Sequence, residues 1–164
     1  MTNDQFATYQ KLITDIRECM LVTDDPSVGL RSRPMSCSKC DDDGNLWFFT
    51  KMTSDKVQEI YHDRNVNCAF QKPGDNQYVS VSGKARLVDN PGLKKSLYSP
   101  FLDAWFDGPT DPQATLICVD AVAAEYWNDS DSKLVSFAKI AATALVGAEY
   151  DAPETEKLTF AKDG

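Results

Sequence analysis

Histidine is almost absent from this chain: among its 164 residues, His62 is the only one. Triads of the Ser-His-Asp or Cys-His kind require a histidine base, and no strained nucleophile turn accompanies His62. We expect His62 to be a solvated residue near the C-terminal end of a short helix, where the helix dipole favours a cation. The sequence therefore argues against hydrolysis through such a triad.

Long apolar runs and a basic leader segment are also missing. No apolar stretch approaches the roughly 20 residues that span a bilayer, and Met1-Thr2-Asn3-Asp4-Gln5 has no basic cluster followed by an apolar stretch. The five cysteines are an odd number, which argues for reduced thiols. We therefore expect a cytoplasmic protein that does not act in a membrane.

Positive charge is scarce overall but not in the middle of the chain. The formal net charge of -8 would repel a phosphate backbone, which argues against nucleic acid as a partner. The segment from Arg31 to Arg86, however, contains nine Lys and Arg residues and only seven Asp and Glu residues. Chance clustering on a solvated face explains this balance, and so does a small anionic ligand held by the central segment.

Glycine-rich phosphate loops of the standard types are absent, and strands do not alternate regularly with long helices. These absences argue against a nucleotide-binding α/β sheet. A hydrophobic fraction of 42% and a mean hydropathy of -0.40 fit one globular domain. We assign the domain to residues 1–150 and a C-terminal tail to residues 151–164.

Apolar periodicity predicts helices at both ends and short strands between them. Helical spacing is found over 4–20, with Asn3 or Asp4 as the cap, over 55–63 after Ser54, in pieces over 90–106, and over 133–146. Alternation or apolar runs predict strands over 20–23, 31–39, 46–50, 66–71, 78–87 and 115–127. Pro34 lacks an N–H group, so an interior position there would need a bulge. This order predicts an α+β protein built on a closed or nearly closed antiparallel β-barrel.

Three motifs have an ordinary structural explanation. Cys37-Ser38-Lys39-Cys40 has the spacing of redox and zinc sites, but no second pair follows to complete a metal site, so we expect structural thiols and no metal. Asp41 to Asp43 form a solvated turn. The segment Phe101 to Phe106, which holds Trp105, is either core or a stacking platform, and the sequence alone favours core.

One constellation points to a phosphate. If the strand of Arg33 and the strand ending at Thr50 form a hairpin, both residues lie near one end of it, and Ser54 and Lys56 open the following helix. Helix-start N–H groups, hydroxyl donors and two cations suit a bound dianion. Four unrelated surface residues would give the same pattern.

The ordered motifs Arg31-Ser32-Arg33-Pro34-Met35, Leu46-Trp47-Phe48-Phe49-Thr50 with Ser54-Asp55-Lys56, and Tyr78-Val79-Ser80-Val81-Ser82-Gly83-Lys84-Ala85 resemble the FMN-binding split barrels of the pyridoxamine 5'-phosphate oxidase superfamily. Glu125-Tyr126-Trp127 and the helix after it resemble the general stress protein 26 branch. The resemblance implies a six-stranded antiparallel split β-barrel with Greek-key connections and flanking helices. It also implies a homodimer and bound FMN, with FAD as an alternative.

Carried over by position, the resemblance places Arg33 and Lys56 at the FMN phosphate and Thr50 and Ser54 beside the phosphate and ribityl chain. Pro34 and Met35 would pass along the isoalloxazine. Tyr78 stands where the oxidases have a glutamine, and Asp55 stands where the family often has a basic residue.

The part of the sequence that binds substrate in the true oxidases is different in this chain. Nothing after Trp127 resembles their Arg-Leu-His-Asp-Arg segment, so we expect flavin binding without oxidation of vitamin B6. Three functions stay open: a flavin-dependent oxidoreductase of unknown substrate, a non-catalytic flavin carrier or sensor, and a deazaflavin-binding barrel.

Overall fold

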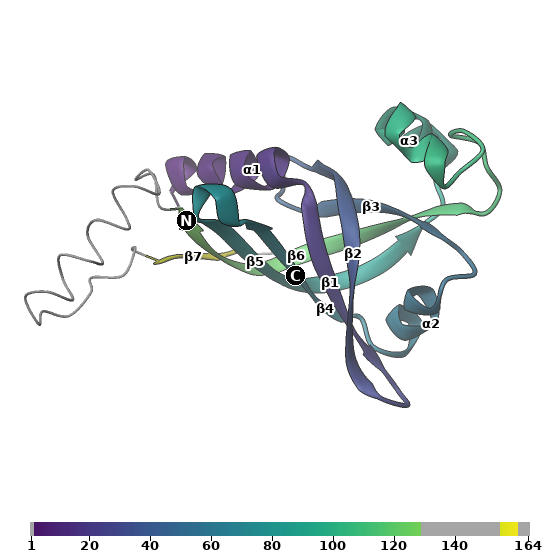
Figure 1. The fold of residues 1–164 in the computed structure, drawn as a ribbon, viewed down its shortest axis with the longest axis horizontal. Coiled ribbons are helices and arrows are strands. Elements are labelled where there is room, and N and C mark those ends of the chain that lie inside the picture. The colour runs from purple at the N-terminus through teal and green to yellow at the C-terminus, as the bar shows by residue number, and fades with distance from the viewer. Residues whose placement is uncertain (1, 129–154, 161–164) are drawn as a thin grey trace, which may run out of the picture.

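Seven antiparallel strands form one sheet in the order β3-β2-β1-β4-β5-β6-β7, and β3 pairs with β6 as well (Figure 1). The computed structural model describes residues 2–128 and 155–160. The β3–β6 pairing closes β1 to β6 into a six-stranded barrel, which confirms the predicted α+β antiparallel barrel. The strands are β1 Glu18–Asp25, β2 Gly29–Cys40, β3 Leu46–Lys51, β4 Asn65–Lys72, β5 Gln77–Val88, β6 Ala114–Asn128 and β7 Thr155–Thr159.

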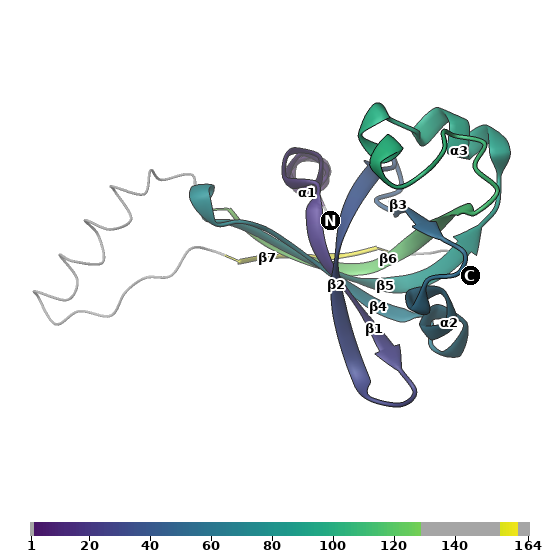
Figure 2. The ribbon, with the colours of Figure 1, turned by 45° about the vertical axis from the view of Figure 1, so that its right-hand side comes forward.

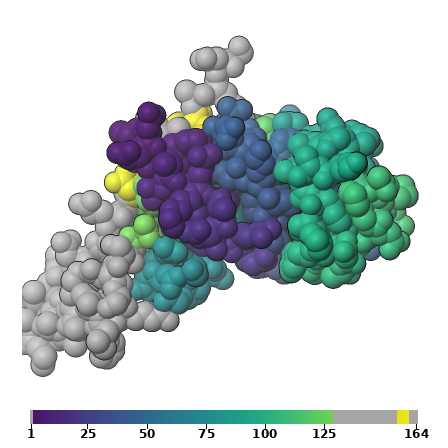
Figure 3. All heavy atoms as spheres, turned by 90° about the horizontal axis from the view of Figure 1, so that it is seen from above, coloured from purple at the N-terminus to yellow at the C-terminus, as the bar shows by residue number. Residues whose placement is uncertain are grey.

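Three α-helices and two 3-10 turns accompany the strands in the described part of the chain. They are α1 Asn3–Ile16, α2 Asp55–His62, η1 Pro73–Asp75, α3 Pro91–Leu97 and η2 Pro100–Ala104. Seen from above, α1 and the α3–η2 segment lie on either side of the β2–β3 segment (Figure 3). The break at Pro100 follows the prediction, because proline fits the start of a new turn but not the interior of a helix.

Pro34 occupies an edge position of β2. This strand pairs with β1 from Gly29 to Ser36 but with β3 only from Cys37 to Cys40. Pro34 therefore has a strand partner, Met20, on one side only, which is where a residue without an N–H group is tolerated. The β1–β2 hairpin extends beyond the rest of the sheet (Figure 2).

The boundaries of the first helix differ from the prediction. Thr2 caps α1 through a capping box with Gln5, in place of Asn3 or Asp4. The helix ends at Ile16 because Arg17 adopts a φ of 63°, and β1 begins at Glu18. Residues 18–20 are thus strand, since the buried Cys19 and Leu21 contribute to the barrel interior.

The C-terminal part gives two further outcomes. The predicted helix over 133–146 lies outside the described residues. β7 lies in the segment assigned to the C-terminal tail, where no strand was predicted, and it pairs with β6 and buries Leu158. Among the described residues, no helix is long and apolar enough to cross a membrane.

A second apolar cluster lies outside the barrel interior and positions the site. Phe49 of β3 and Leu116 of β6 pack against Leu102 and Phe106, which belong to residues 100–106, η2 and the two residues after it, called the η2 segment below. Phe49 contacts the ring of Phe106 at 5.9 Å between centroids. The η2 segment is thereby fixed beside the C-terminal end of β3.

Gly83 is required where β5 and β6 shift register. A Cβ atom there would lie 2.5 Å from the carbonyl oxygen of Asp120 and 2.7 Å from Cγ1 of Val119. We expect Gly83→Ala to lower the free energy of unfolding by about 1–3 kcal/mol, measured by urea denaturation. Gly92→Ala in α3, where the nearest atom would be 3.4 Å away, is the control and is expected to be neutral or stabilising. A Gly83→Ala protein as stable as the parent would contradict this packing.

Candidate functional site

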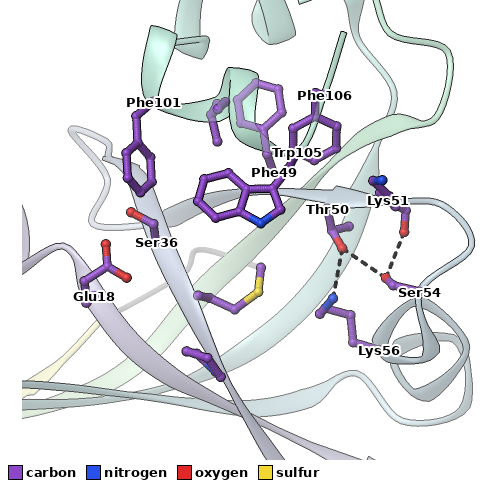
Figure 4. A pocket seen from close by; sticks show the side chains of 13 residues that line it. Glu18, Ser36, Phe49, Thr50, Lys51, Ser54, Lys56, Phe101, Trp105 and Phe106 are labelled. Atoms are coloured by element: carbon purple, nitrogen blue, oxygen red, sulfur yellow. Dashed lines mark hydrogen bonds between the residues drawn. The ribbon is translucent and has the colours of Figure 1, made fainter. Parts of the chain in front are cut away.

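A cavity of about 430 Å³ opens between β2, the end of β3, the start of α2 and the η2 segment (Figure 4). Its size lies within the range of small-ligand pockets. Two kinds of side chain gather at opposite parts of it, hydroxyl and ammonium groups around α2 and aromatic rings around η2. The lining residues are Glu18, Pro34, Met35, Ser36, Phe49, Thr50, Lys51, Ser54, Lys56, Phe101, Leu102, Trp105 and Phe106.

The cationic end is organised around Thr50. The Lys56 ammonium donates to Thr50 Oγ1 at 3.2 Å, and Thr50 Oγ1 lies 3.0 Å from Ser54 Oγ. Ser54 Oγ donates to the Lys51 carbonyl at 2.8 Å, which leaves Thr50 as the donor to Ser54. Since Ser54 makes no side-chain cap bond to α2, the first-turn N–H groups have no hydroxyl partner from it.

Lys56 is a half-buried cation without a counter-ion. Within residues 2–128 and 155–160, no carboxylate oxygen lies within 4.0 Å of its ammonium. Burial lowers the pKa of Lys56 and the neighbouring Arg33 cation lowers it further, while the more distant Glu59 and Asp55 carboxylates offset part of this shift. A charge held in this way is stabilised by an incoming anion.

Arg33 does not line this cavity, although it lies close enough to affect Lys56. Its Nη2 atom lies 2.5 Å from Oε2 of Glu59, a carboxylate that is only 3% exposed. Thr23 donates to the same carboxylate, and Arg31 reaches Oε1 of Glu59 at 3.1 Å. This network attaches α2 to β1 and β2 and neutralises Arg33.

The other predicted positions divide between the cavity and the far end of the sheet. The structure brings Pro34, Met35, Thr50, Ser54 and Lys56 together along one cavity. Tyr78 is not among the lining residues: it is at the start of β5, opposite Gln71 of β4 and Trp127 of β6, and is 38% exposed.

The cysteine pair is separate from the cavity. Cys37 is buried and donates to the carbonyl of Lys39, and burial raises the pKa of its thiol. Burial also raises the pKa of Cys40 to about 12. Both thiols are therefore protonated near neutral pH, which fits a structural role.

Sequence reasoning missed Glu18 and Ser36, and for the segment Phe101 to Phe106 it favoured core over a stacking platform, whereas only part of this segment is buried. Leu102 and Phe106 are both 7% exposed, whereas Phe101 and Trp105 are 55% and 52% exposed. The signal was present, because 101 and 105 repeat the four-residue spacing of 102 and 106 on a different side of one short segment. A short turn resting on the barrel buries one of these pairs and leaves the other at the surface.

The Glu59 network gives a stability prediction. We expect Glu59→Ala to lower the free energy of unfolding by about 3–5 kcal/mol, because Arg33 loses its counter-charge in a partly buried position. Asp15→Ala is the control, since it breaks the exposed Lys11–Asp15 pair, and it should cost less than about 1 kcal/mol. If urea denaturation gave the same decrease in the free energy of unfolding for both variants, the Glu59 network would contribute no more to stability than an exposed ion pair.

Comparisons with known proteins agree with this arrangement. A family model described as pyridoxamine 5'-phosphate oxidase like matches residues 4–151. Protein bli-3 of Neurospora crassa is 30% identical over 146 residues, which cover 82% of this chain and 70% of bli-3. General stress protein 26 of Bacillus subtilis is 30% identical over 91 residues, which cover 53% of this chain and 64% of that protein.

A solved structure gives the same assignment. The general stress FMN/FAD binding protein of Xanthomonas citri is 30% identical, with a TM-score of 0.68 over 80% of this chain and 93% of that one. The motif order, the closed six-stranded barrel and these matches lead to one conclusion: the chain belongs to the pyridoxamine 5'-phosphate oxidase-like family, with relatives named general stress protein 26.

Proposed function

We propose that this chain binds FMN in the cavity between β2, β3, α2 and η2 and acts as a flavin-dependent oxidoreductase. The observation that carries the proposal is the half-buried Lys56 ammonium, which binds the Thr50 hydroxyl beside Ser54 and has no carboxylate within 4.0 Å in the described part of the chain. A phosphate dianion supplies the missing charge and accepts from the Lys56 ammonium, and it accepts from Thr50 and Ser54 once these hydroxyls rotate away from their present acceptors. The Xanthomonas citri relative, named as an FMN/FAD binding protein, supports the same class of ligand.

Each part of the cavity has a role toward such a ligand. Lys56, Thr50 and Ser54 would hold the phosphate, with the first-turn N–H groups of α2 beside them. Pro34 and Met35 would line the cavity along the ribityl chain and the isoalloxazine ring of FMN. When bound, the flavin supplies the redox chemistry, and the protein supplies position and charge.

Arg33 has a different role from Lys56 in this proposal. Its guanidinium already contacts Glu59 and Thr23, so a phosphate gains less from it than from an unpaired cation. Arg33 would act indirectly, because its pairing with Glu59 attaches α2, the helix of Lys56, to β2. We therefore expect the loss of Lys56 to weaken phosphate binding more than the loss of Arg33.

The functional protein in this proposal is a cytoplasmic homodimer. Exposed apolar side chains support an interface: Val28 and Leu30 on the β1–β2 hairpin are 69% and 79% exposed, and Val122 on β6 is 45% exposed. Leu30 and Val122 also border a second hollow on the outer face of the sheet. The five free thiols suit a reducing compartment.

The absorption spectrum of the purified protein, with the mass of any released cofactor, tests the class of cofactor. Released FMN would support the proposal. Released FAD would mean that the cofactor is FAD instead of FMN, and a released deazaflavin would mean that the ligand belongs to a different cofactor class. NADPH oxidation with an added acceptor then separates the enzyme from a carrier, because an enzyme must pass electrons faster than free FMN does. Turnover of pyridoxamine 5'-phosphate at an enzymatic rate would overturn the expectation that this chain does not oxidise vitamin B6.

Lys56→Ala tests the phosphate end. We expect it to weaken FMN binding by roughly 10- to 150-fold, because it removes a charge-assisted contact worth about 1.5–3 kcal/mol. Riboflavin, which lacks the phosphate, should bind the variant as it binds the parent. The matched control is Lys95→Ala, an exposed lysine of α3 that does not line the cavity. Unchanged FMN affinity in titration calorimetry would refute the assignment of Lys56.

The pH dependence of FMN binding gives a second test. The protonated Lys56 binds phosphate, and its pKa lies below the ordinary value of 10.5. FMN affinity should therefore fall as the pH rises through this lowered pKa, and the fall should begin earlier than for an ordinary lysine. Lys56→Arg keeps its charge at high pH and should lack this decline. Superimposable profiles for the parent and Lys56→Arg would contradict the role of Lys56.

A further inference from the structure

Two rings at the aromatic end of the cavity are not used to attach the η2 segment to the barrel. Leu102 and Phe106 already attach the η2 segment to Phe49 and Leu116 of the barrel. Phe101 and Trp105 take no part in that cluster and remain more than half exposed. Two large apolar rings facing solvent side by side indicate a surface that a ligand covers.

The two rings are arranged as one wall. Their centroids lie 5.1 Å apart with an interplanar angle of 54°, so Phe101 supports the indole of Trp105. Both residues line the cavity that also holds Thr50 and Lys56, and the indole lies between Phe101 and Thr50 (Figure 4). A ligand that fills this cavity contacts a flat apolar surface at one end and a cation at the other.

The charged side chains at the two ends of the cavity determine the orientation of a bound ligand. Glu18 lies at the cavity border near Phe101 and Ser36, away from Lys56 (Figure 4). Its carboxylate repels a phosphate from the aromatic end, while Lys56 attracts one to the other end. The phosphate therefore belongs at Lys56, and the uncharged planar part belongs against Trp105.

We infer that Trp105, supported by Phe101, is a specificity-determining residue that stacks on the planar fused ring of the ligand and selects it independently of the phosphate. The inference rests on the proposed flavin function and adds a recognition element that the phosphate contacts do not supply. The cavity is thus a bipartite site. Trp105 stacks on the ring, and Lys56 binds the phosphate.

The experiment compares two ligands that share the ring, FMN and riboflavin, on four variants of the full chain. Trp105→Ala should weaken both ligands by the same factor, about 5- to 150-fold, because the lost stacking is common to both. Trp105→Phe should recover most of this loss, since it restores an aromatic face. Tyr61→Ala removes another exposed ring, which lies outside the cavity, and should change neither affinity.

Lys56→Ala completes the comparison, because it should weaken FMN alone. Trp105 is half exposed, so its truncation should leave the unfolding midpoint near that of the parent. A second readout is intrinsic fluorescence: riboflavin should quench the parent strongly and Trp105→Phe much less, with Trp47 and Trp127 as the remaining emitters.

The outcomes separate the two claims. If the parent binds FMN but Trp105→Ala binds both ligands with unchanged affinity, the stacking wall is wrong and the flavin function stands. If Trp105→Ala weakens FMN but not riboflavin, the residue acts at the phosphate end and the inference is also wrong. If the parent binds neither ligand, the flavin proposal fails, and this inference fails with it.

Discussion

Pairing of β3 with β6 is the constraint on which the rest of this structure depends. It closes the barrel and fixes the C-terminal end of β3, where Phe49 and Thr50 are neighbours in sequence. Strand alternation sends their side chains to opposite faces. Phe49 holds the η2 segment from outside the barrel, and Thr50 binds Lys56 at the start of α2. One short strand end therefore positions both halves of the cavity.

Ionic pairing then decides which cations remain available. Glu59 is nearly inaccessible to solvent and is shared by Arg31 and Arg33. Arg33 is paired with this carboxylate, while Lys56, on the same helix as Glu59, has a hydroxyl group as its hydrogen-bond partner among the described residues. A chain with a net charge of -8 therefore still has, in Lys56, a partly buried cation without a carboxylate partner within 4.0 Å among the described residues.

Much of the barrel could be predicted from local patterns. The Asp41–Asn45 turn, the break at Pro100 and the alternation of Val79 and Val81 depend on neighbouring residues, and each is found in the structure. Tyr61 lies four residues after the buried Val57, yet it is 65% exposed, because the buried residues of α2 are Val57, Glu59 and Ile60 only.

The site was less accessible to sequence reasoning, since its contacts join distant segments. Thr50, Ser54 and Lys56 are close in the chain, and they meet as predicted. The pairing of Arg33 with Glu59 spans 26 residues and carries no local signal. The exposure of Trp105 likewise depends on which side of η2 the barrel covers. A crystal structure with bound FMN tests the account most directly: it predicts the phosphate within hydrogen-bond distance of Lys56 Nζ, and a phosphate placed anywhere else would contradict it.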